Sequence, residues 1–244
     1  MKKNAIVSRE TGKKILGGDD MPIYNTPLLT IDAKETRRYA GLQKAQDFSE
    51  DKILAACQDA RLLAQPRSVW EIYDYDCQTQ LIQAKPPCQI QGEKIGQHLA
   101  GCEKVILLAA TVGEDIEDDV TNRFNNGEYS MAVLLDAAAT AAVEQVADGL
   151  EKALAPKMAA QGFGMKWRFS PGYSDWPLEQ QPELIRLSHA QSIGVGLSSS
   201  MMLMPRKSIT AIIGLYRKQE NNAMNHSPNG CAACSQQNCP SRKI

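Results

Sequence analysis

The chain has 244 residues, of which 43% are hydrophobic and 23% charged, values close to the globular average. This composition excludes a disordered chain, a collagen-like rod and a coiled coil, and the length allows one large domain or two small ones. The formal net charge of −1 offers no overall attraction to nucleic acid or to an anionic membrane.

Location in the cell follows from the first residues and from the apolar segments. Residues 1–14 are polar and basic with no apolar stretch behind them, so we expect no secretory signal. The apolar segments 105–112 and 131–135 are far shorter than the ~20 residues of a membrane-spanning helix. We therefore expect a cytoplasmic protein without a membrane span, whose seven cysteines form no disulfide framework.

The first half of the chain predicts an irregular arm over residues 1–30, followed by alternating helices and strands. Asp32 and Glu35 have the spacing of a capping box, which begins the first helix. In chain order, the sequence predicts a helix over 32–41, a helix over 49–65, a strand over 68–76, a helix over 93–100, a strand over 104–111 and a helix over 114–124.

The longest predicted helix covers residues 132–154. Its many alanines permit close approach by another backbone, and Pro156 is expected to end it. A strand over 165–169 follows and leads directly into a Pro-Gly turn.

The C-terminal part of the chain completes the predicted fold class. Asp175 is expected to cap the next helix, and strands are predicted over 197–204 and 208–216. Helices and strands thus occur in both halves, which indicates an α+β domain. We assign residues 1–220 to this domain and 221–244 to a linker with a Cys-rich tail.

One segment, RFSPGYSDWP from Arg168 to Pro177, gathers several ligand-binding features. A turn in which Gly172 takes a positive φ would place an arginine, exposed backbone N–H groups, an aromatic ring and a helix N-terminus in one small volume. Such a pocket suits a small ligand with a carboxylate, which a guanidinium binds in a bidentate fork. The alternative interpretation is an ordinary turn.

Acidic residues on the Ala-rich helix form a second candidate site. Glu144 and Asp148 share one face of the helix by their spacing of four, and Asp136 lies two turns earlier. Two acids on one face could hold an amine or a sulfonium. The alternative is a solvated helix face.

Three cysteines near the end, Cys231, Cys234 and Cys239, form a third candidate. Thiolates at this spacing can hold zinc or an iron–sulfur cluster, for which His226 or Cys102 could supply a fourth ligand. A redox-active thiol pair is the alternative.

Several catalytic motifs are absent from the sequence. It contains no Gly-rich dinucleotide loop, no phosphate-binding Gly-Lys-Ser/Thr loop and no nucleophile elbow. Its three histidines lie far apart, which argues against a histidine base or a His-metal centre. An autonomous hydrolase, kinase or dehydrogenase is therefore not expected.

The RFSPGY segment resembles the reactivation domain of cobalamin-dependent methionine synthase, which carries the pattern Arg-x-Ala/Ser-Pro-Gly-Tyr-x-x-x-Pro. The segments 142–148 and 197–214 resemble the same domain in the same order, so the similarity covers roughly residues 130–216. The likeness to a smaller group of stand-alone proteins of this kind extends over nearly the whole chain. The matching positions of the motif are Arg168, Ser170, Pro171, Gly172, Tyr173 and Pro177.

The resemblance implies an α+β fold with a twisted, mainly antiparallel sheet and flanking helices. It also implies a module that binds S-adenosylmethionine and supports reductive methylation of cob(II)alamin. Because corrinoid-binding modules are missing from the chain, a separate cobalamin-binding methionine synthase or other corrinoid protein would carry the cobalamin. A flavodoxin-like donor would supply the electron, and the chain would be an accessory part of a methyltransferase.

Roles for individual residues also follow from the resemblance. Arg168 would hold the methionine carboxylate, the Ser170 backbone and Gly172 would form the binding turn, Tyr173 would shape the pocket, and Glu144 would lie near the charged end of the ligand. Two alternative functions stay open: a redox or metal protein centred on the Cys-rich tail, and an adaptor that docks a corrinoid protein.

Overall fold

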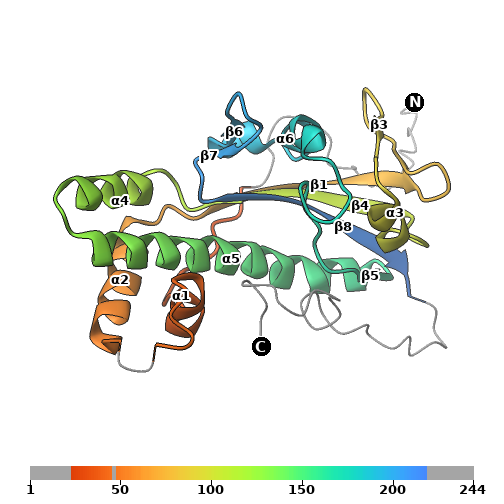
Figure 1. Ribbon diagram of the computed structural model, residues 1–244. Coiled ribbons are helices and arrows are strands. Elements are labelled where there is room, and N and C mark those ends of the chain that lie inside the picture. The colour runs from red at the N-terminus through yellow and green to blue at the C-terminus, as the bar shows by residue number, and fades with distance from the viewer. Residues whose placement is uncertain (1–22, 46–47, 219–244) are drawn as a thin grey trace, which may run out of the picture.

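The computed structural model describes residues 23–45 and 48–218, in which helices pack on both faces of an antiparallel sheet (Figure 1). This arrangement confirms the predicted α+β class. The helices of the described residues are α1 Ala33–Tyr39, α2 Glu50–Leu63, α3 Glu93–His98, α4 Asp115–Asn125, α5 Tyr129–Ala160 and α6 Gln181–Leu187, with 3-10 turns η1 Leu178–Gln180 and η2 Ala190–Ile193. The strands are β1 Arg67–Asp76, β2 Leu81–Ile82, β3 Cys88–Gln89, β4 Lys104–Thr111, β5 Phe163–Met165, β6 Gly196–Leu197, β7 Leu203–Met204 and β8 Ser208–Arg217.

Within the described residues, the main sheet has the strand order β3-β2-β1-β4-β8-β5, and every pairing in it is antiparallel. Strand β4 lies in the middle, where Leu108 faces Trp70 of β1 and Ala211 of β8. Both faces of β4 are covered, so it is an almost continuous apolar run rather than an alternating one. Its bounds were predicted correctly from that run.

The two faces of the sheet carry separate hydrophobic clusters. Ile106 and Leu108 of β4 pack with Leu150 and Leu154 of α5 on one face. Their neighbour Leu107 points to the opposite face, where it packs in a cluster with residues of α3 and α6. Figure 1 shows the same layering, with α5 below the sheet and α6 above it.

Helix α5 packs against two different partners along its length. Its first half contacts α1, α2 and α4 through small buried side chains, among them Ala138 and Ala142. Its second half lies under the sheet. The close approach that the alanines predicted therefore occurs between helices, at the end of the molecule drawn on the left of Figure 1.

The prediction that Pro156 ends this helix is wrong, because α5 continues to Ala160. A proline inside a helix removes one backbone hydrogen bond and crowds the preceding turn. Here Leu154 and Met158, on either side of the proline, are both at least 98% buried against the sheet. Burial of these two side chains offsets the free-energy cost of the proline. The helical spacing of buried apolar residues therefore continues past Pro156.

By length and composition alone, α5 is the one helix of the described residues that could cross a membrane. A central helix of a globular fold meets the same criteria. In this structure 61% of its most apolar window is buried inside the protein, against other helices and the sheet. The absence of a membrane span stays a prediction.

Two predicted strands differ from the strands of the structure. Residues 197–204 form a small hairpin, β6 and β7, around a turn at Ser198–Met202 instead of one strand. The strand predicted over 165–169 overlaps β5 only at Met165, where β5 ends, and a single bridge between Phe169 and Ile212 follows. Both segments lie at an edge, where fewer backbone groups have partners.

Residues 23–31 cross α5 as an irregular segment. The Thr26 hydroxyl donates to the Val146 carbonyl at 3.0 Å, and the Gln145 amide donates to the Thr30 carbonyl at 3.0 Å. The segment passes so close to Gly149 that a Cβ atom there would lie 2.3 Å from Cγ2 of Thr26. Gly149 is therefore required by a close approach of two chain segments.

Replacing Gly149 with alanine is expected to lower the free energy of unfolding by about 1–2 kcal/mol. Overpacking costs about 1–3 kcal/mol, and the better helix propensity of alanine returns a little under about 1 kcal/mol. Urea unfolding measures the difference. Thr26→Ser removes Cγ2 and keeps the hydroxyl, so Gly149→Ala should cost less in that background. An equal loss in both backgrounds would show that contact with Thr26 is not the cause.

Candidate functional site

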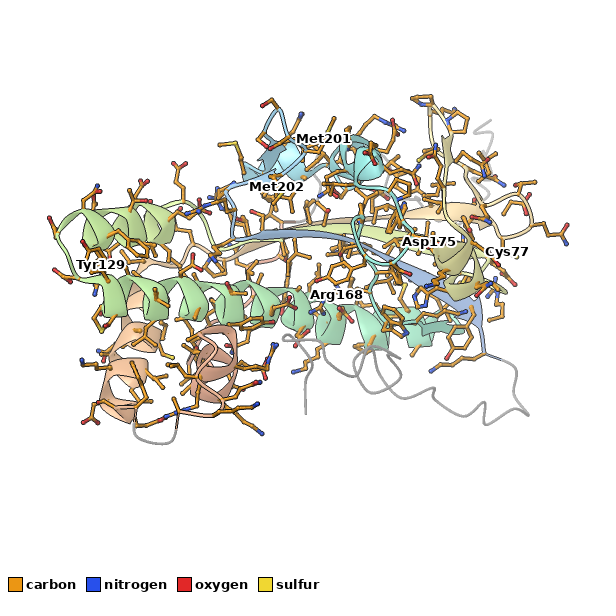
Figure 2. The ribbon with its side chains drawn as sticks, viewed as in Figure 1. Cys77, Tyr129, Arg168, Asp175, Met201 and Met202 are labelled. Atoms are coloured by element: carbon orange, nitrogen blue, oxygen red, sulfur yellow. The ribbon has the colours of Figure 1, made fainter. Side chains whose placement is uncertain are left out.

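The predicted ligand segment begins at the edge of the main sheet, beside β8. Phe169 exchanges both backbone hydrogen bonds with Ile212 of β8, at 2.9 and 2.8 Å. Its ring packs in the cluster above the sheet. Arg168, one residue earlier, points the opposite way, toward α5 (Figure 2). The alternation of an extended chain thus sends the arginine below the sheet and the phenylalanine above it.

Three acidic side chains of α5 surround the Arg168 guanidinium. Nη2 contacts Oε2 of Glu144 at 2.5 Å, and Nη1 contacts Oδ1 of Asp148 at 2.6 Å. Nη1 also contacts Oε1 of Glu151. The acids lie at spacings of four and three on one helix face, so all three reach the same point. We call these four side chains the Arg168 cluster.

The Arg168 cluster is only partly open to solvent. Side-chain exposure is 19% for Arg168 and 23% for Glu151, against 39% for Asp148. Burial raises the pKa of Glu151, although the neighbouring guanidinium lowers it. The surrounding carboxylates raise the pKa of Arg168 against the effect of its own burial, so the guanidinium is permanently charged.

Charge is unbalanced in the cluster. Three carboxylates face one guanidinium, which leaves a surplus of two negative charges when all groups are ionised. The nearby Tyr39 adds no positive charge; burial, and next the charge of Glu144, raise its pKa to about 12. A surplus of partly buried negative charge favours a cationic ligand group, because an unpaired charge away from water is costly.

The Pro-Gly turn follows two residues after Arg168. Gly172 has a φ of +87°, which confirms the predicted positive φ. The backbone N–H of Gly172 donates to the Trp176 carbonyl at 2.9 Å, and that of Tyr173 donates to the Ser170 carbonyl at 3.3 Å. The expected exposed N–H groups are therefore used inside the turn at these two positions. The Tyr173 side chain is 68% exposed, at the surface of the turn.

The prediction that Asp175 caps the helix that follows it is wrong. Its Oδ2 accepts hydrogen bonds from the backbone N–H groups of Glu93 and Lys94, at 2.7 and 2.9 Å, at the start of α3 (Figure 2). The 3-10 turn η1 that follows begins at Leu178, directly after Pro177, and has no side-chain cap. The Asp175 cap therefore connects the Pro-Gly turn to α3, a helix about eighty positions earlier in the chain. No local pattern in the sequence predicts this contact.

Replacing Asp175 with alanine is expected to lower the melting temperature at pH 7 and to speed amide exchange at Glu93 and Lys94. These hydrogen bonds lower the pKa of Asp175 below its ordinary value of 3.8. A lowered pKa means that the stabilisation is present above 3.8 and is lost as the pH falls through the lower, folded value. The difference between wild type and variant should therefore shrink in strong acid. Glu179→Ala, at an exposed acid of η1, is the control; equal exchange rates in wild type and Asp175→Ala would contradict the cap.

The turn is anchored from inside by Trp176. This side chain is 1% exposed, and its Nε1–H donates to Oε1 of Gln180 at 2.6 Å. The Gln180 amide in turn donates to the Gln89 carbonyl at 2.7 Å. The motif segment is thus fixed at Phe169 and Trp176, with the exposed residues 172–175 between these two anchors.

The structure brings together two of the five predicted binding residues, Arg168 and Glu144. Ser170, Gly172 and Tyr173 lie in the adjoining turn. Asp148 also joins the cluster, as the helix spacing indicated, but Asp136 pairs with Lys207 at 2.9 Å.

Sequence reasoning missed Glu151 in this site. The sequence feature that could have identified Glu151 is its spacing of seven residues from Glu144, which places both acids on the same helix face two turns apart.

The predicted metal ligands Cys231, Cys234 and Cys239 lie outside the described residues. Within residues 23–45 and 48–218, no group of three or more His, Cys, Asp or Glu side chains could hold a metal ion. The four cysteines described there are free. Cys57, Cys88 and Cys102 are buried, as expected for core thiols, and Cys77 is half-buried.

Comparison with solved structures identifies the fold. The chain is similar to a crystal structure of the MetH reactivation domain bound to AdoHcy, with a TM-score of 0.52 and 11% sequence identity over 83% of this chain and 81% of that one. The protein therefore has the fold of a methionine synthase reactivation domain. A scan against family models finds no match, and a search of curated proteins finds none either.

Proposed function

We propose that this protein is a cytoplasmic S-adenosylmethionine-binding module that supports reductive methylation of cob(II)alamin on a separate cobalamin-dependent methionine synthase. The observation that carries the proposal is the shared fold, since the solved domain of that fold is a reactivation domain bound to AdoHcy. AdoHcy is what remains of S-adenosylmethionine after its methyl group is transferred.

The chemistry of the Arg168 cluster fits this ligand. S-adenosylmethionine carries a carboxylate, an ammonium and a sulfonium at one end. A guanidinium can pair with the carboxylate, and the surplus acids can pair with the two cations. We assign the carboxylate to Arg168, the cationic end to Glu144, and the remaining contacts to the turn formed by Ser170, Gly172 and Tyr173.

In this proposal the protein binds and orients, and the ligand supplies the reactive group. When bound, S-adenosylmethionine supplies a methyl group. The described residues offer a charged site at the edge of a rigid sheet, next to an exposed turn on which a corrinoid protein can dock. A flavodoxin-like donor supplies the electron, and positioning accounts for the whole of the protein's contribution.

Calorimetric titration of the purified full-length protein with S-adenosylmethionine tests the proposal. We expect saturable binding of one ligand per chain. Adenosine, which lacks the charged end, is the control ligand and should bind far more weakly. Absence of saturable binding, both alone and with an added cobalamin-binding domain of methionine synthase, would refute the proposed function.

A further inference from the structure

The charge imbalance of the Arg168 cluster has a consequence for which ligand the site retains. Nη1 of Arg168 already contacts both Asp148 and Glu151, and Nη2 contacts Glu144. A ligand carboxylate that reaches this guanidinium is therefore the fourth acid around one arginine. Its arrival is unfavourable unless the ligand brings positive charge of its own.

S-adenosylmethionine and its demethylated product differ in that respect. The former has an ammonium, a sulfonium and a carboxylate, with one net positive charge. In the product the sulfur is a neutral thioether, and the net charge is zero. Next to a surplus of two negative charges, the loss of the sulfonium removes an attraction while the repulsion on the carboxylate stays.

We propose that Asp148 and Glu151 make the site selective for cationic S-adenosylmethionine over neutral S-adenosylhomocysteine, so that methyl transfer itself weakens binding and releases the product. This inference rests on the proposed function of the same site. The S–CH₃ bond breaks and the sulfur keeps its electron pair. The electron from the donor and one from cob(II)alamin form the new Co–C bond.

Asp148 is the acid that a ligand meets first. Its side chain is the most exposed of the three, at 39%, against 29% for Glu144 and 23% for Glu151. It shares one guanidinium nitrogen with Glu151, so either acid can hold Arg168 when the other turns to the ligand. Asp148 and Glu151 are therefore specificity-determining residues with partly redundant roles.

Paired calorimetric titrations with S-adenosylmethionine and S-adenosylhomocysteine test the inference. In the wild type we expect S-adenosylmethionine to bind about tenfold more tightly than S-adenosylhomocysteine. This difference in affinity is of the size that one additional charge interaction contributes at a partly exposed site. Asp148→Asn and Glu151→Gln should each reduce that ratio several-fold, mainly by tightening binding of the neutral ligand. Asp136→Asn, on the same helix but paired with Lys207, should leave the ratio unchanged.

Ionic strength supplies a second readout, because screening weakens charge interactions. The wild-type ratio should fall as salt is added, and the ratio of the Asp148→Asn variant should fall less. Equal affinity of the wild type for both ligands, or a ratio that both variants leave intact, would overturn the inference while the proposed function stands. Failure of both ligands to bind would overturn the proposed function and this inference together.

Discussion

Arg168→Ala is expected to abolish measurable S-adenosylmethionine binding and to lower the free energy of unfolding by about 3 kcal/mol, as for other partly buried ion pairs that lose one partner. The variant removes the group assigned to the ligand carboxylate and leaves three acids of α5 facing each other. Calorimetry measures the first effect and urea unfolding the second.

The stability loss should depend on pH. Arg168 lowers the pKa of Glu151 against the effect of burial, so its removal raises that pKa further. An acid with a raised folded pKa favours the folded state below its unfolded pKa, and this contribution is lost as the pH rises through the folded value. The variant should therefore be most impaired at neutral pH and recover toward the ordinary carboxyl value of 4.5.

Two further variants separate binding from folding. Arg186→Ala, the control, breaks a half-buried ion pair with one acid, Glu183, and a hydrogen bond to the Pro86 carbonyl, and should cost about 1 kcal/mol. Arg168→Ala combined with Asp148→Asn and Glu151→Gln removes most of the repulsion, so this protein should regain stability without regaining wild-type affinity. Wild-type affinity in the combined variant would remove Arg168 from the binding site.

Trp176→Ala should cost about 3–5 kcal/mol, the range for a buried tryptophan reduced to a methyl group. The side chain is 1% exposed and packs with Phe169, at a ring-centroid distance of 6.1 Å, under the Pro-Gly turn. Its loss leaves a cavity and removes one of the two hydrogen bonds that the Gln180 side-chain oxygen accepts, while the bond from the Gln91 backbone N–H remains. Urea unfolding followed by circular dichroism gives the free energy.

Trp167→Ala is the matched control for this prediction, since Trp167 lies in the same segment and is 39% exposed. We expect it to cost less, about 1–2 kcal/mol, because its ring contacts the rings of His98 and Phe169 but is only partly buried. Trp176→Phe should fall between the two, since it keeps most of the ring packing and loses the hydrogen bond. Equal costs at positions 167 and 176 would argue against the anchoring role.

The elements that were predicted well are those with a strong local period. Strand β4 is buried on both faces and has the apolar run typical of such strands, and Gly172 needs a positive φ for the turn that contains it. The end of α5 was wrong because the sequence showed the cost of Pro156 but not the sheet that Leu154 and Met158 pack against. Local rules cannot weigh a proline against burial that distant strands provide.

In the candidate site, too, local features were predicted correctly and contacts between distant segments were not. The spacing of Glu144 and Asp148 indicated one helix face, and the Arg-x-Ser-Pro-Gly-Tyr pattern indicated a binding turn. Local spacing gave no sign that the two meet, since Arg168 lies 24 residues beyond Glu144, and only the family resemblance placed both residues at one ligand. Asp175 was placed on the wrong helix for the same reason: a capping residue needs a free helix start in reach, and only the tertiary fold decides which one that is.

The Arg168 cluster lies where α5 passes from one hydrophobic cluster to the next. The hydrophobic cluster that α5 forms with α1, α2 and α4, which also includes Ala110 at the end of β4, runs to Ala147, and the cluster that α5 forms with the middle of the sheet begins at Leu150. Residues 144–151 therefore cross the junction between two packing units that share one continuous rod. A ligand held there would tighten the joint between the helical end and the sheet, so that the two units would stiffen together and resist bending as a single body.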